Sequence, residues 1–148
     1  MIEKIKSIVL GTAAKLRWLA PLLARIVIGA VFIQTGWLKL HHLGEVTEFF
    51  RSLGIPAARI QAPFVAGVEL VCGMLVLLGV FTRLSAIPLI GTMVVAILTA
   101  KMKALTGPLD LLGIQEFDYI VMLTGLFIFG PGAVSVDQFI CKRCAGTE

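Results

Sequence analysis

The chemically most informative feature of this sequence is an acid inside an apolar run. Residues 62–80 read APFVAGVELVCGMLVLLGV, and Glu69 is the only carboxylate among them. As an α-helix this run extends ~28 Å, close to the ~30 Å hydrocarbon thickness of a bilayer. A carboxylate at that depth is energetically costly, so it is normally paired or functional. We therefore expect Glu69 to face the interior of a helix bundle.

A cation with a matching pattern lies in the first apolar run, at about residues 18–38. It belongs to a stripe with the spacing of one helical face, formed by Arg25, Gly29, Phe32, Gly36 and Lys39. Small residues also flank Glu69 along its own stripe, which allows close approach of two membrane helices. Because arginine binds carboxylates in a bidentate geometry, we predict an Arg25–Glu69 ion pair.

Two interpretations of this polar stripe stay open. The ion pair can fix the register of two helices, or the same groups can form a site for a ligand or a proton. Lys39 and Asp118 belong to the same candidate set, because both are expected near the outer ends of their helices. A Lys39–Asp118 or Lys39–Glu116 pair is predicted there.

Histidine and cysteine offer a weaker basis for chemistry. His41 and His42 are adjacent, so on a helix their side chains point ~100° apart and do not clasp one metal. A haem oxidase core needs several histidines at membrane depth, and the sequence contains only these two. Cys141 and Cys144 form one C-x-x-C motif, which supplies two of the four ligands of zinc. We predict no metal site and expect these thiols to be dispensable, with thiol–disulfide exchange as the alternative.

The composition is that of a membrane protein. Of 148 residues, 58% are hydrophobic and 15% are charged, whereas soluble domains carry ~25% charged residues. The net charge of +4 is not gathered in a basic block with interleaved aromatic residues, so nucleic-acid binding is not expected. A single membrane domain comprising residues 1–148 is predicted.

The elements that must position the polar groups follow from the apolar runs. These runs predict an all-α integral membrane four-helix bundle, with spans at about residues 18–38, 62–80, 84–100 and 116–130. The fourth run is short, so it requires tilted neighbours or a thinned bilayer. Short interfacial helices are expected at residues 1–17 and 43–53, an irregular loop at 101–117, and a short amphipathic helix at 135–144.

The basic residues predict the orientation. More of them fall on the side that holds both termini than on the opposite side, so both termini are expected in the cytoplasm. The first apolar run lacks a small-x-small cleavage site near its end and is expected to be a retained span. The prediction is a multi-pass protein of the bacterial inner membrane.

Five sequence fragments occur in an order and spacing that resembles the DoxX family of four-span membrane proteins. They are R-x3-G-x2-F-x3-G-x2-K-L at 25–40, L-G-I-P at 53–56, E-x3-G at 69–73, L-L-G-V-F-T-R at 77–83 and G-P-G-x2-S-x-D at 130–137. The family is named from subunits associated with terminal quinol oxidase and thiosulfate–quinone oxidoreduction. Other members look like accessory proteins in thiol and oxidative-stress systems. The resemblance thus implies an inner-membrane protein near quinone or thiol redox chemistry.

Three functions compete on these grounds. The first is an accessory, redox-linked subunit whose bundle holds a quinone or lipid beside Glu69 and Arg25, next to partner redox subunits or a second copy of the chain. The second is an enzyme, at most part of a quinone-linked oxidoreductase, because the sequence has no haem, flavin, nucleotide or zinc motif. The third is a lipid-binding or structural membrane module without a redox role. A co-purified quinone would favour the first two functions over the third.

Overall fold

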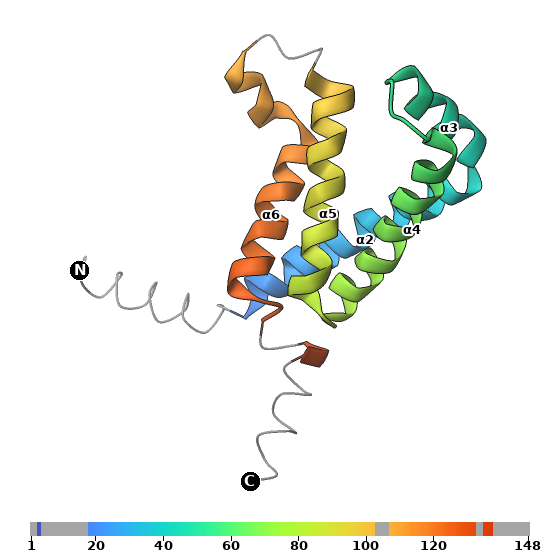
Figure 1. Ribbon diagram of the computed structural model, residues 1–148. Helices are drawn as coiled ribbons and strands as arrows, with labels where there is room; N and C mark the ends of the chain where they lie inside the picture. Colours follow the sequence, from blue (N-terminus) through green and yellow to red (C-terminus); the bar gives the residue numbers. More distant parts are fainter. Residues whose placement is uncertain (1–2, 4–17, 103–106, 133–134, 138–148) are drawn as a thin grey trace.

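Every described element of the computed structural model is a helix, which confirms the predicted all-α class (Figure 1). The structure describes residue 3 and residues 18–102, 107–132 and 135–137. The α-helices are α2 (Leu19–His41), α3 (Leu43–Ser52), α4 (Ala58–Leu78), α5 (Thr82–Ala96) and α6 (Gln115–Phe129). A π-helix, η1 (Ile97–Lys101), continues α5, and a 3-10 helix, η3 (Pro108–Gly113), precedes α6. The helices predicted at 1–17 and 135–144 lie largely outside the described residues.

Three of these helices are long and apolar enough to cross a bilayer, so this is a membrane protein. They are Leu19–His41, Ala58–Leu78 and Thr82–Lys101, the last combining α5 with η1. Helix α6 has 15 residues and is ~22 Å long, shorter than the ~30 Å hydrocarbon core. A fourth span therefore remains a prediction that rests on tilt or bilayer thinning.

The helices associate as two antiparallel pairs, α2 with α4 and α5 with α6 (Figure 1). The pairs meet where α2 begins and α6 ends, and they diverge toward the end that carries α3 and η3. The buried apolar side chains come from α2, α4, α5, η1 and α6, and the largest of them are Phe32, Ile28, Leu89 and Leu123. Many other large apolar residues are exposed on the surface of the bundle. Such a surface suits helices that face lipid and not water.

Glycine allows α2 and α4 to lie in close contact. A Cβ atom at Gly36 would lie 2.5 Å from the backbone nitrogen of Leu70, and one at Gly29 would lie 2.7 Å from the Cβ of Leu77. No side chain larger than hydrogen fits at these positions without moving the helices. The close approach predicted from the small-residue stripes is confirmed here, and the two contacts define the antiparallel register of the pair.

The connections differ in part from expectation. Helix α3 lies where a surface helix was predicted, and α4 turns sharply into α5 through residues in left-handed conformation, Gly79 and Phe81. The expectation of an irregular loop at 101–117 was wrong for Pro108–Gly113, which forms η3. Asp110 accepts a hydrogen bond from the backbone N–H of Gly107 at 3.0 Å, which caps this short helix.

Candidate functional site

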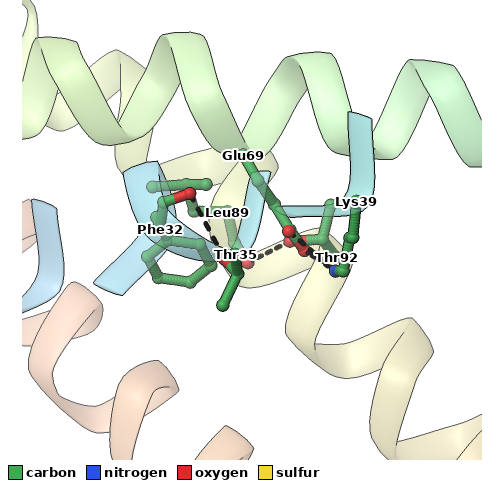
Figure 2. A network of polar contacts seen from close by, with 6 residues as sticks. All are labelled: Phe32, Thr35, Lys39, Glu69, Leu89 and Thr92. Carbon is green, nitrogen blue, oxygen red and sulfur yellow. Dashed lines mark hydrogen bonds and ion pairs between the residues drawn. The ribbon is translucent and has the colours of Figure 1, made fainter. Parts of the chain in front are cut away.

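Glu69 is paired with Lys39 (Figure 2). The Nζ atom of Lys39 lies 2.6 Å from Oε1 and 2.7 Å from Oε2 of the carboxylate. The Glu69 side chain is 1% exposed and that of Lys39 is 31% exposed. The expectation that Glu69 faces the bundle interior is confirmed, but the predicted Arg25–Glu69 pair was wrong.

The antiparallel register of α2 and α4 explains the choice of cation. Gly36 packs against Leu70, so Glu69 lies at the height of the C-terminal part of α2, where Lys39 can reach it. Side chains on a helix lean toward its N-terminus, and the Lys39 stem therefore points back into the bundle. Arg25 lies nearly four turns before Lys39, toward the start of α2, beside Gly79.

Arg25 belongs to a second polar cluster at the opposite end of the bundle. It is buried against the turn between α4 and α5 and is attracted electrostatically by Asp137. The Asp137 carboxylate accepts hydrogen bonds from the backbone N–H groups of Phe81, at 2.9 Å, and Thr82, at 3.3 Å. Its own N–H donates to the Gly79 carbonyl at 3.0 Å. Sequence reasoning quoted this aspartate within G-P-G-x2-S-x-D but assigned it no role.

The other predicted pairs are not formed. Lys39 directs its ammonium at Glu69, so the Lys39–Asp118 and Lys39–Glu116 pairs were both wrong. Asp118 is exposed, and Glu116 lies 3.6 Å from Lys101. Of the four candidate residues, the structure therefore brings together only Lys39 and Glu69.

Two threonines extend the polar site. The Thr35 hydroxyl donates to the Phe32 carbonyl at 3.2 Å, and the Thr92 hydroxyl donates to the Leu89 carbonyl at 2.8 Å. Figure 2 draws both in one polar network with the ion pair. Because each hydroxyl hydrogen is used within its own helix, the oxygens remain able to accept. Sequence reasoning missed both, although Thr35 stands one helical turn before Lys39 on the same face.

The donor count shows what this site can do. A lysine ammonium has three N–H donors, and within the described residues Glu69 accepts two of them. The third can donate to an external acceptor without breaking the ion pair. The carboxylate and the two threonine oxygens can accept from a ligand hydroxyl. The site is neutral overall and suits a ligand whose polar end carries carbonyl or hydroxyl groups.

No metal centre emerges from the described part of the chain, where no three His, Cys, Asp or Glu side chains cluster. His41 and His42 are exposed, and their Nδ1 atoms lie 2.9 Å and 3.0 Å from the backbone carbonyls of Trp37 and Leu38. Cys141 and Cys144 lie outside the described residues, so their dispensability remains a prediction.

Comparison with known proteins finds one matching family model and several relatives. The DoxX family model matches residues 20–102, a range that contains both Lys39 and Glu69. The uncharacterized membrane protein Rv3486 of Mycobacterium tuberculosis is 37% identical over 131 residues, covering 80% of this chain and 80% of its own. CatD of Bacillus subtilis, which is named provisionally as an oxidoreductase, is 32% identical over 126 residues, covering 84% and 89%. The inner membrane protein YqjF of Escherichia coli is 26% identical over 129 residues, covering 87% and 98%. No solved structure gives a significant match.

Proposed function

The chain belongs to the DoxX family of membrane proteins, and on that premise we propose that it binds a quinone at the Lys39–Glu69 pair as an accessory subunit of a redox system. The proposed role is to hold the quinone for a partner redox subunit. The partner, and not this chain, supplies the electrons.

The observation that carries this proposal is the uncommitted third N–H of Lys39. A quinone headgroup has two carbonyl acceptors and no donor, so it needs N–H or O–H groups from the protein. Lys39 can supply one while Glu69 keeps the ammonium neutralised at 2.6 Å and 2.7 Å. The reduced form carries hydroxyls, which the Glu69 carboxylate and the oxygens of Thr35 and Thr92 can accept.

The position of the site suits a ligand that arrives through the bilayer. Exposed tryptophans mark both ends of α2, Trp18 and Trp37, and they are ~28 Å apart along the helix. Tryptophan favours the membrane interface, so we expect Lys39 near the outer interface with its ammonium turned inward. The Lys39 side chain is partly exposed, so we expect a headgroup to reach its ammonium.

The proposed location is the bacterial inner membrane, with four spans and both termini in the cytoplasm. Gly132, just beyond α6, packs against Pro21 near the start of α2, so the chain returns to the end of the bundle where α2 began. This contact favours an even number of crossings. Two relatives, YqjF and YphA of Escherichia coli, are named inner membrane proteins. The redox link draws support from the name of CatD, and the partner subunits and self-association are part of the proposal.

The proposal is tested by purifying the protein in lipid nanodiscs and identifying extracted lipids by mass spectrometry. We expect a quinone to co-purify with the unmodified protein and with Lys101→Met, which removes an exposed lysine that is also ion-paired. The double variant Lys39→Met with Glu69→Gln should lose the quinone, and it leaves no uncompensated buried charge. Phospholipid alone in every sample would reject quinone binding and favour the lipid-binding or structural alternative.

A further inference from the structure

Tyr119 is a polar residue of the bundle that the proposed site does not yet use. It lies in the second turn of α6 and is the only tyrosine in the chain. Its ring centroid is 5.9 Å from that of Phe32, with the ring planes at 59°, and it packs against the buried core. Phe32 is 1% exposed, and its carbonyl accepts the hydrogen bond from Thr35. One aromatic contact therefore connects Tyr119 to the polar network around Glu69.

The Tyr119 hydroxyl makes no hydrogen bond within the described part of the chain, although the residue is partly buried. Partly buried tyrosines usually present an apolar ring to the core and a hydroxyl to a polar partner. The ring of Tyr119 follows this pattern, because it packs against the ring of buried Phe32. Tyr119 thus adds a hydroxyl donor on α6 to the third N–H of Lys39 on α2.

We infer that Tyr119 is a second contact for the quinone headgroup, donating its O–H to the carbonyl opposite the one that Lys39 binds. This inference rests on the proposed function. Lys39 and Phe32 are seven residues apart on the same face of α2, and the Lys39 stem leans back toward Phe32. The two carbonyls of a quinone lie at opposite ends of its ring, so donors on α2 and α6 can each take one. The ligand then contacts both α2 and α6.

The single tyrosine allows a direct test by fluorine NMR. Protein labelled with 3-fluorotyrosine carries one fluorine resonance, which is titrated in nanodiscs with a short-chain ubiquinone. We expect the resonance to shift on titration in the unmodified protein. Loss of one neutral hydrogen bond in Tyr119→Phe should weaken ubiquinone affinity about fivefold to tenfold. Phenylalanine keeps the ring contact with Phe32, so the fold is expected to persist.

Matched variants separate the outcomes. Thr124→Val removes another hydroxyl from α6, one that donates to the Ile120 carbonyl of its own helix, and should leave affinity unchanged. The role of Tyr119 would be overturned if ubiquinone left the fluorine resonance of the unmodified protein unshifted and Tyr119→Phe kept its affinity. The proposed function would still stand if Lys39→Met with Glu69→Gln lost ubiquinone binding in the same series. Absence of ubiquinone binding by the unmodified protein would overturn both.

Discussion

Lys39 and Glu69 join α2 to α4 through an ammonium placed within 2.6 Å and 2.7 Å of the two carboxylate oxygens. The lysine could extend to the nearby interface, yet its stem turns inward to a carboxylate that is 1% exposed. Each charge makes the other tolerable in hydrocarbon, and the remaining ammonium donor is what makes the pair a candidate binding site.

The two halves of this pair should respond unequally to substitution. Lys39→Met leaves a fully buried, uncompensated carboxylate and should lower the free energy of unfolding by ~3–5 kcal/mol. Glu69→Gln should cost less, because Lys39 is partly exposed and can turn toward the interface. The double variant should be more stable than the sum of the single losses predicts. Thermal unfolding in detergent measures this, with exposed Glu45→Gln as the control, and strictly additive losses would contradict the coupling.

The close approach of α2 and α4 predicts a sharp contrast between two glycines. Alanine at Gly36 would put its Cβ 2.5 Å from a backbone nitrogen of α4, so Gly36→Ala should destabilise the protein by ~1–3 kcal/mol. A Cβ added at Gly91 on α5 would have no neighbouring atom within 4 Å, so Gly91→Ala should be neutral or slightly stabilising. Melting temperatures in detergent compare the two, and equal losses would refute the packing argument.

Asp137 should stabilise the start of α5. Asp137→Ala removes the acceptor for two backbone N–H groups and the attraction for Arg25, and should cost ~1–2 kcal/mol. Asp137→Asn keeps one acceptor oxygen and should lose less. Exposed Asp118→Asn is the control for charge alone. Thermal unfolding again provides the measurement, and a wild-type melting temperature for Asp137→Ala would show that the contact contributes nothing.

Reporter fusions test the proposed topology. A fusion after Glu148 should report the cytoplasm, because the end of α6 packs beside the start of α2 and the basic residues favour that side. A fusion within residues 103–106 should report the exterior. The reverse pattern would invert the orientation, and two reporters on the same side would remove one of the crossings.

Much of this protein follows from sequence alone, because hydropathy and helical spacing are local properties. The apolar runs predict α2, α4 and α5, and the acid within 62–80 indicates a buried, paired Glu69. The glycine stripe correctly predicts a close α2–α4 contact. The sequence does not determine whether α6 crosses the bilayer, because this helix is shorter than the hydrocarbon core.

Only the tertiary structure decides which basic residue pairs with which acidic residue. Arg25 and Lys39 lie on the same face of α2, so helical spacing cannot choose between them. The choice depends on the register in which Gly36 meets Leu70, and this register is a property of two packed surfaces. Arg25 is instead attracted electrostatically by Asp137, which is distant in sequence. The two residues meet because the chain after α6 returns to the end of the bundle where α2 begins. Contacts between distant segments are set by packing, which no local pattern records.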